Sequence, residues 1–358
     1  MTAPVHTFAG AHPRPPRPPL HGGVATLISY AIAVASRPQR VIEDLERIRE
    51  FSDFIMLDCG AFTIRRRGLE VDVDRYAAFA REVSRRGLVD VVVNLDVGST
   101  IDMVRNQRTL ESAVRGNAYV MWVYQPFHGE RHLRRMLLRY PYVGLGTAGM
   151  DSGAHAVVRN DEVARYYVEV FRTLREHDAA AHGFAMTKPT FLLRPDLPWS
   201  TVDSSSWTSA ARWGFGVLPD ERDGTILQVP HPYCHVARST NLGNRIPTTD
   251  FDRTSELLHR YNLSVREWSA MSTTETLVVS ALGHYAVEDE VNARRDPAEF
   301  AATAARLRTV GLPQLADRRG CFRMVLVVGR EENSTTARTA QVLRQRAFDA
   351  CNTAGGPP

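Results

Sequence analysis

The sequence predicts an α/β protein: a closed (β/α)8 TIM barrel followed by a mostly helical C-terminal region. The main observation is a rhythm in which short apolar runs alternate with amphipathic, charged segments, about eight times in all, which favours parallel strands with helices between them. The second observation is size, because eight such units over roughly 220 residues match a closed barrel. An open, doubly wound parallel sheet is the structural alternative.

The expected strands are short runs of branched and aromatic residues, and the segments between them have helical spacing. Residues 72–87 and 161–177, for example, place apolar side chains three and four positions apart, which is typical of a helix with one buried face. The strands are expected at residues 25–31, 54–58, 89–97, 118–124, 142–147, 181–186, 200–203 and 225–229.

Three regions are expected along the chain. Residues 1–21 form a flexible tail that contains proline and arginine, and residues 22–230 form the barrel. Residues 231–358 begin with a loop and continue as a mainly helical region that packs on the barrel. Within that last region, residues 251–315 have helical patterns and residues 323–329 favour one more strand.

Composition limits the classes of function. The chain has 358 residues, 44% hydrophobic, and a net charge of only +4, so it is not a polycation. No cysteines form a CxxC pair among Cys59, Cys234, Cys321 and Cys351, which favours a reducing, cytoplasmic location over a disulfide scaffold. Residues 24–36 end like a signal peptide, but the preceding stretch is long and proline-rich, so a buried strand is expected instead. No stretch reaches the length of a membrane span.

Carboxylates fall where predicted strands end. Asp58 ends the second run, Asp96 the third and Asp203 the seventh. The catalytic residues of a parallel barrel collect at these ends, and crowded carboxylates raise one another's pKa, which suits acid/base chemistry. A single aspartate at a strand end is more often the N-cap of the next helix, and this is the alternative for Asp58. Three aspartates at equivalent strand ends favour a functional site.

Two further polar segments follow the fourth and fifth runs. His128 comes after the fourth, where the alternative is a turn histidine packed on Phe127. The stretch 144–149 (GLGTAG) lacks the spacing of a dinucleotide fingerprint, so its glycines are expected to let the backbone approach a flat ligand.

Four blocks resemble the tRNA-guanine transglycosylases, especially the shorter phage and bacterial relatives that place 7-deazaguanine bases in DNA. The resemblance covers about residues 25–220, and its most specific block combines a His-Gly-Phe sequence with an Asp-Ser-x-Ser-aromatic pattern. The blocks are LDCGAF (57–62), FHGERHLRR (127–135), GLGTAG (144–149) and HGFAMTKP with WSTVDSSSW (182–207).

The resemblance implies a role for each matching residue. Asp203 would be the nucleophile that holds the sugar as a covalent ester, and Asp58 would be the acid/base. Asp96 would accept hydrogen bonds from guanine. The remaining base pocket would comprise Cys59, Gly60, His128, Gly129, Gly146, Thr147, Ala148 and Ser204.

The implied partners are a 7-deazaguanine base such as preQ0 and DNA, with no membrane. Arg65, Arg66 and Arg67 would contact phosphates, unless they are only a solvated face. No cofactor is expected; a structural zinc, known in the family, would have to use His231, Cys234 and His235. Four alternatives stay open: tRNA as the polymer, a small nucleoside as the donor, a homodimer, and a non-catalytic accessory subunit that binds a base or nucleic acid.

Overall fold

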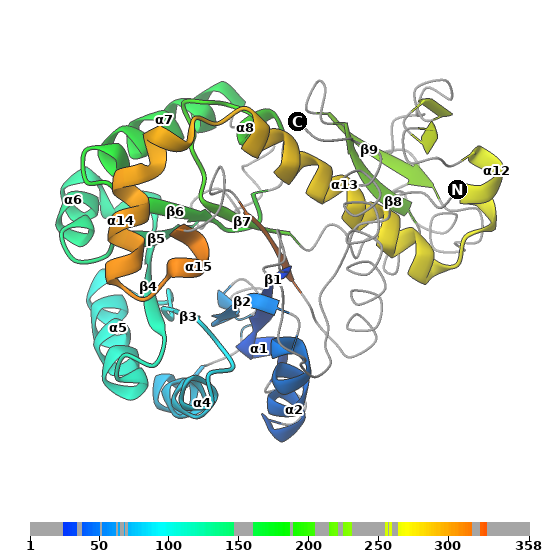
Figure 1. The fold of residues 1–358 in the computed structure, drawn as a ribbon. Helices are drawn as coiled ribbons and strands as arrows, with labels where there is room; N and C mark the ends of the chain where they lie inside the picture. Colours follow the sequence, from blue (N-terminus) through cyan, green and yellow to red (C-terminus); the bar gives the residue numbers. More distant parts are fainter. Residues whose placement is uncertain are drawn as a thin grey trace, which may run out of the picture.

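The computed structural model describes residues 24–33, 38–50, 52–61, 64, 68, 71–146, 160–186, 189–204, 215–220, 225–230, 255–256, 258–259, 264–316 and 323–327. In this part of the chain, eight parallel strands close into a barrel with helices around it (Figure 1). The order around the barrel is β1-β10-β7-β6-β5-β4-β3-β2, and β2 pairs again with β1. The strands are β1 (Val24–Ser29), β2 (Ser52–Asp58), β3 (Val91–Val93), β4 (Tyr119–Tyr124), β5 (Tyr142–Leu145), β6 (Ala180–Gly183), β7 (Thr201–Ser204) and β10 (Arg323–Val327).

The predicted (β/α)8 barrel is therefore confirmed, but the prediction of its eighth strand at 225–229 is wrong. That run is β9 (Thr225–Pro230), which pairs antiparallel with β8 (Phe215–Asp220) in a separate two-stranded sheet. Only residues 221–224 join the two strands, whereas a parallel pair needs a crossover of about a dozen residues. The Asp-Gly pair at 223–224 is a hairpin signal that the β/α rhythm concealed.

The strand that closes the barrel is β10, which lies between β1 and β7. The barrel thus includes residues 323–327, which the sequence analysis placed in the appended region. Arg323 begins β10, and its side chain is 2% exposed and forms a 2.5 Å ion pair with Asp53 at the start of β2. The ion pair links β10 to β2, the two strands that lie on either side of β1.

The helices that surround the barrel bury one face each. In α2, for instance, the buried side chains are Val41, Ile42, Leu45 and Ile48, the spacing of one helical stripe. The connecting helices are α1 (Tyr30–Ala33), α2 (Pro38–Arg49), α4 (Val73–Arg85), α5 (Thr100–Val114), η1 (Pro126–His128), α6 (Glu130–Leu137), α7 (Asn160–Arg175) and α8 (Pro189–Leu192).

Side-chain hydrogen bonds fix where two of these helices begin. Asp72 caps α4 by accepting from the Asp74 backbone N–H at 2.9 Å. Ser99 and Asp102 form a capping box at the start of α5. Because α5 follows the loop that carries Asp96, this cap also fixes one end of that loop.

The C-terminal region is mostly helical, as expected, and part of it seals the barrel. Its elements are α12 (Val265–Ala270), α13 (Thr273–Ala293), η5 (Pro297–Phe300), α14 (Ala301–Thr309) and α15 (Pro313–Ala316). Leu307, Leu312 and Leu315 belong to the same apolar cluster as the inward-facing Phe54 and Val91. Figure 1 shows α14 and α15 across one open end of the barrel, and Arg306 donates there to the Leu137 carbonyl, which precedes β5.

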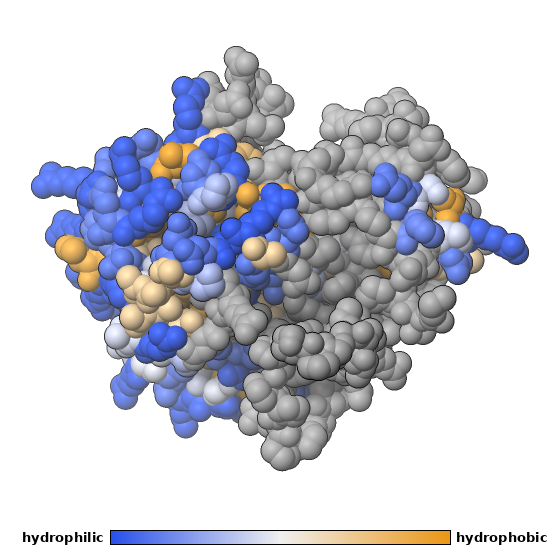
Figure 2. Space-filling model, turned by 45° about the horizontal axis from the view of Figure 1, so that its top comes forward, coloured by the Kyte–Doolittle hydropathy of each residue, from blue (hydrophilic) through white to orange (hydrophobic). Residues whose placement is uncertain are grey.

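Polar side chains cover most of the described surface that can be seen in one view. In the face drawn in Figure 2 it is predominantly hydrophilic, with separate apolar spots. The large apolar side chains that are exposed in the described part are Ile101, Phe127 and Leu138. The described helices include none with the length and apolarity needed to cross a bilayer.

Replacing Leu307 by alanine tests whether the barrel and the C-terminal helices share one core. Leu307 is fully buried, so we expect a loss of about 2–5 kcal/mol in the free energy of unfolding, with a single cooperative transition. The measurement is urea denaturation followed by circular dichroism. Ala305→Ser, on the exposed side of the same helix, should change stability by less than about 0.5 kcal/mol. Two separate transitions in Leu307→Ala would contradict a shared core.

Candidate active site

Three carboxylates meet at the end of the barrel where the strands terminate. Asp58 is the last residue of β2, Asp96 lies in the loop after β3, and Asp203 lies in β7. The charges of both Asp96 and Asp203 act on Asp58 and raise its pKa. The structure therefore brings together the three acids that the sequence singled out, although they are far apart along the chain.

Asp58 has the protonation behaviour of an acid/base group. Burial is the largest cause that raises the pKa of this carboxyl, followed by the charges of Asp96 and Asp203, and the pKa reaches about 7. Hydrogen bonds from the backbone oppose this shift, including one of 2.9 Å from the Gly60 N–H to Asp58 Oδ2. Asp58 therefore accepts a hydrogen bond from the residues that follow it, as a capping residue does. Because these backbone bonds lower its pKa, capping does not account for the raised value.

Packing requires a glycine at position 60. It has φ +80, and a Cβ atom there would lie 2.5 Å from Ala31 Cβ and 2.6 Å from Ser29 Oγ. The chain that approaches Gly60 closely is therefore the end of β1 and the start of α1. The contact of Gly60 with a base, which the resemblance implies, stays a prediction.

Asp96 is 8% exposed, and neighbouring side chains donate to both of its oxygens. Cys59 Sγ donates to Oδ1 at 3.5 Å, and Gln125 Nε2 donates to Oδ2. Burial raises the pKa of the Cys59 thiol well above its usual value, so the thiol keeps its proton and remains a donor. Cys59 itself has no exposed surface, so it supports Asp96 from behind.

The loop that carries Asp96 is held by amide side chains. Asn94 Nδ2 donates to the Met103 carbonyl at 3.1 Å, and Asn106 Nδ2 donates to the Leu95 carbonyl at 2.9 Å. Below the loop, the Tyr76 hydroxyl donates to the Val93 carbonyl at 2.8 Å and lies 3.2 Å from the Leu57 carbonyl. Tyr76 thereby fixes the ends of β2 and β3 next to each other.

Gln125 is the site residue that the sequence analysis missed. It directly follows β4, is 1% exposed and donates to Asp96. The signal that identified the three acids, a polar residue at the end of an apolar run, applies equally to YVMWVYQ at 119–125. An amide cannot titrate, so its residue type is a weaker signal of chemistry than a carboxylate or the nearby histidine.

Gly146 makes room for Gln125. A Cβ atom at Gly146 would lie 2.3 Å from Gln125 Nε2, so the amide of Gln125 already occupies the space beside this glycine. The Gly146 N–H donates to the Tyr124 carbonyl at 2.8 Å. The close approach expected at 144–149 is thus made, at Gly146, by the protein's own side chain. Thr147 and Ala148 lie outside the described residues.

Asp203 is oriented from one side. Its Oδ1 accepts from the Ala185 N–H at 2.6 Å, and His182 Nε2 lies 3.4 Å from the same oxygen, near the upper limit for a hydrogen bond. The Asp203 side chain is 11% exposed and that of His182 is fully buried. In the described part of the chain, no hydrogen bond is made to Oδ2, so one oxygen is held while the other is left for chemistry.

A buried chain of polar groups runs behind Asp203. His182 Nδ1 lies 2.8 Å from Thr201 Oγ1, which lies 2.5 Å from the Tyr142 hydroxyl. Burial raises the pKa of Tyr142, so its hydroxyl keeps a proton to donate. With Tyr142 donating to Thr201 and Thr201 donating to Nδ1, the ring hydrogen is on Nε2, which lies 3.4 Å from Asp203 Oδ1 and makes no hydrogen bond in the described structure. His182 thus presents positive hydrogen, and not a lone pair, to the carboxylate.

His128 packs as a turn histidine, the alternative considered from the sequence. Its ring lies 4.5 Å from Phe127 and 4.7 Å from His132, between ring centroids, and its Nδ1 accepts from the Gln125 N–H at 3.0 Å. Burial lowers the pKa of His128 to about 4. Its hydrogen bond positions the Gln125 backbone, and Gln125 is the residue that reaches Asp96. Gly129 next to it, at φ +74, accepts from His132 and Leu133 at the start of α6.

Several predicted residues cannot be placed. Ser204 ends β7, but its side chain lies outside the described part of the structure, as do Arg65, Arg66 and Arg67. The proposed zinc ligands His231, Cys234 and His235 also lie outside it. Within the residues that are described, no cluster of three His, Cys, Asp or Glu side chains could hold a metal ion.

Comparisons with known proteins give no relative for this chain. No family model matches it, and no match was found among the curated proteins or the solved structures. Function must therefore be argued from the site itself.

The pKa of Asp58 predicts a particular dependence of stability on pH. The folded protein holds this proton up to about pH 7, and the unfolded chain holds it only to its ordinary value near ~4. Between these values the folded state binds more protons, so raising the pH lowers the unfolding free energy, by up to about 1.4 kcal/mol per pKa unit.

Asp58→Asn should remove this contribution. We expect stability close to the parent's at pH 4 and higher than the parent's at pH 8, measured by urea denaturation with tryptophan fluorescence. Glu43→Gln, an exposed change on α2, should follow the parent at every pH. A difference between Asp58→Asn and the parent that does not vary with pH would mean that Asp58 titrates normally.

Proposed function

We propose that this protein is a base-exchange glycosyltransferase that replaces guanine in a nucleic acid, with DNA favoured, by a 7-deazaguanine. The observation that carries the proposal is the group of three carboxylates at the strand ends, one with a pKa of about 7 and another with one oxygen held by a backbone N–H. Such perturbed, grouped acids favour an enzyme over a passive binding module. The block resemblance to transglycosylases supplies the reaction class.

The first half-reaction breaks the bond between sugar and guanine. An Asp203 oxygen attacks C1′ of the nucleotide, a C1′–O bond forms, and the electron pair of the C1′–N9 bond leaves with guanine. Asp58 in its protonated form gives a proton to the departing base. Because its pKa is about 7, a substantial fraction of Asp58 carries that proton at neutral pH.

The second half-reaction reverses these roles. Ionised Asp58 takes a proton from the incoming 7-deazaguanine, whose ring nitrogen attacks C1′ and releases the Asp203 carboxylate. Two inversions at C1′ retain the anomeric configuration. One carboxyl can act first as acid and then as base only if both forms are accessible at working pH, which is what the raised pKa of Asp58 provides.

Asp96 and Gln125 are the proposed readers of the base. An ionised carboxylate only accepts hydrogen bonds, and Cys59 and Gln125 hold Asp96 in place, so Asp96 is suited to accept from the N–H groups of guanine. Gln125 donates to Asp96 through Nε2 and so fixes the orientation of that carboxylate. If the substrate is duplex DNA, the target guanine must first be flipped out of the helix, at a cost of a few kcal/mol.

The test is exchange of labelled guanine into four donors: duplex DNA, single-stranded DNA, tRNA and free guanosine. Exchange into DNA supports the proposal as stated, exchange into tRNA or guanosine alone redirects it, and no exchange anywhere favours an accessory, non-catalytic role. Liquid chromatography and mass spectrometry of the digested nucleosides identify the product in each case.

Asp203→Ala should abolish both exchange and the covalent adduct between protein and nucleic acid, detected by denaturing electrophoresis and intact mass. The physical reason is the loss of the atom that bonds to C1′. Asp196→Asn, a change at a partly exposed acid paired with Arg194, should leave exchange unchanged. Persistent exchange in Asp203→Ala would show that another group is the nucleophile.

Asp96→Ala should weaken binding of free guanine more than binding of nucleic acid, because Asp96 reads the base and not the phosphates. We expect at least a tenfold rise in the Kd for guanine by calorimetry, the cost of one to two hydrogen bonds to a charged group. Unchanged affinity for guanine would remove Asp96 from the base pocket.

A further inference from the structure

An exposed aromatic side chain lies beside the candidate active site. Phe127 is 62% exposed, and it comes two residues after Gln125, the amide that donates to Asp96. Because two residues of chain span at most about 7 Å, the backbone of Phe127 lies at the mouth of the site. Its ring therefore offers an apolar face to whatever enters there.

The turn that carries Phe127 is fixed by its neighbours. It is η1, which begins with Pro126, a residue whose own ring restricts φ. His128 Nδ1 accepts from the Gln125 N–H at 3.0 Å, and the ring of Phe127 packs edge-on against that of His128, with 4.5 Å between centroids. Because the ring is already ordered, little conformational entropy is lost when a ligand stacks on it.

Two arginines follow on the helix that comes after this turn. Arg131 and Arg135 are exposed and lie four residues apart in α6, so they share one face of the helix. The acids closest to them, Glu130 and Glu176, are both paired with Arg134, at 2.7 and 2.5 Å. Among the described residues, no carboxylate forms an ion pair with Arg131 or Arg135. Both guanidinium groups can therefore bind an anionic partner.

Phe127, Arg131 and Arg135 form what is called here the α6 strip. The helix follows β4, so it begins at the end of the barrel that holds the three acids, and it lies on the outside of the barrel (Figure 1). The strip therefore starts with an aromatic ring at the mouth of the site and continues with positive charge along the outer wall.

The chemistry of the α6 strip fits a strand of nucleic acid. Bases of any sequence can stack on an aromatic ring, and arginines bind the phosphates between them. A nucleotide that is turned out of a helix also leaves a gap beside its neighbours, and apolar side chains fill gaps of this kind in proteins that unstack DNA.

We infer that the α6 strip binds the polymer strand beside the nucleotide in the active site. Phe127 stacks on a neighbouring base, and Arg131 and Arg135 contact phosphates of the same strand. The inference rests on the proposed function, because it takes the polymer to be a nucleic acid, and it names the surface that holds that polymer. It does not depend on which base is exchanged.

The experiment measures binding of the full chain to a fluorescent single strand of DNA, by anisotropy, at several salt concentrations and with no incoming base. Phe127→Ala should weaken binding about fivefold to a hundredfold, the range for losing the stacking of one base, whereas Phe127→Tyr should bind like the parent. Arg131→Ala combined with Arg135→Ala should reduce the slope of log affinity against log salt by about 1.4, or about 0.7 for each phosphate contact.

A strand of the same length whose sugars carry no bases separates stacking from charge. This strand keeps every phosphate but has nothing to stack on Phe127. Phe127→Ala should therefore bind it like the parent, whereas the double arginine variant should bind it more weakly than the parent and with the smaller salt slope.

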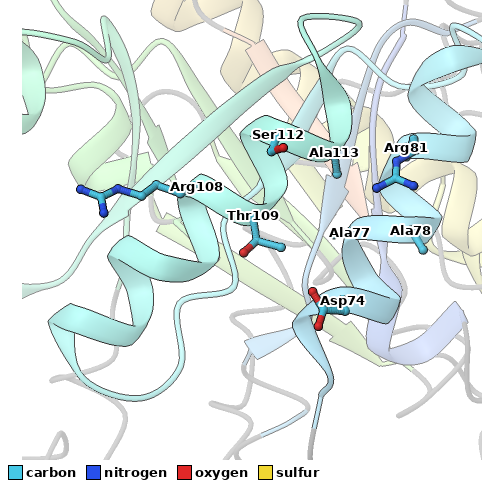
Figure 3. A pocket seen from close by; sticks show the side chains of 8 residues that line it. All are labelled: Asp74, Ala77, Ala78, Arg81, Arg108, Thr109, Ser112 and Ala113. Carbon is cyan, nitrogen blue, oxygen red and sulfur yellow. The ribbon is translucent and has the colours of Figure 1, made fainter.

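A second pair of arginines provides the matched control. Arg81 and Arg85 are also exposed and four residues apart, but they lie in the second half of α4, away from the mouth of the site. Figure 3 shows Arg81 beside the hollow between α4 and α5, and the residues that line this hollow include no aromatic ring. Arg81→Ala combined with Arg85→Ala removes the same charge and should leave the salt slope close to the parent's.

The inference is overturned if the parent does not bind the DNA strand, or if Phe127→Ala binds that strand like the parent. It is also overturned if the arginine pair of α4 changes the salt slope as much as the pair of α6. Exchange of labelled guanine is measured separately. A parent that binds through the α6 strip and exchanges no base would refute the proposed function alone, and exchange by a parent whose binding is unaffected by the strip variants would refute this inference alone.

Discussion

Closure of the parallel barrel is the constraint on which the rest depends. Since every strand of the barrel runs in the same direction, every residue that follows a strand arrives at the same end, whatever its position in the sequence. That is how Asp58, Asp96 and Asp203 come to share one region. The same constraint places the starts of the strands together at the other end, where α14 and α15 cover the apolar interior.

Crowding three acids is unfavourable, and the surrounding groups show how the cost is limited. Gly60 donates to Asp58, Cys59 and Gln125 donate to Asp96, and Ala185 donates to Asp203, so each carboxylate has at least one fixed partner. None of these donors is a cation. These donors contribute dipoles, and burial together with the charges of Asp96 and Asp203 still raises the pKa of Asp58 to about 7.

The sequence predicted the fold class and the three acids because both follow from a local pattern: an apolar run that ends in a polar residue. The residues of β9 were wrongly predicted to form the eighth barrel strand, because a run such as TILQV has the same pattern in a hairpin and in a barrel. Only the pairing of the strand distinguishes the two cases. His128 was favoured over Gln125 by its residue type, and nothing local reveals that Gln125 points at Asp96 while His128 packs on Phe127. Contacts such as Tyr142–Thr201–His182 join distant segments and have no sequence signature.

The late position of β10 has a consequence for synthesis. β1 and β7 pair with β10 and not with each other, so both strands keep an unsatisfied edge until residues 323–327 have been made. Residues 205–322 come between β7 and β10; at ~5–20 residues per second, these roughly 120 residues take on the order of 6–24 s. During that interval an incomplete sheet with two open edges is exposed to other nascent chains, which is the condition under which unpaired strands associate wrongly. The protein's yield in a cell would then depend on chaperones that shield those edges during translation as well as on the stability of the finished barrel.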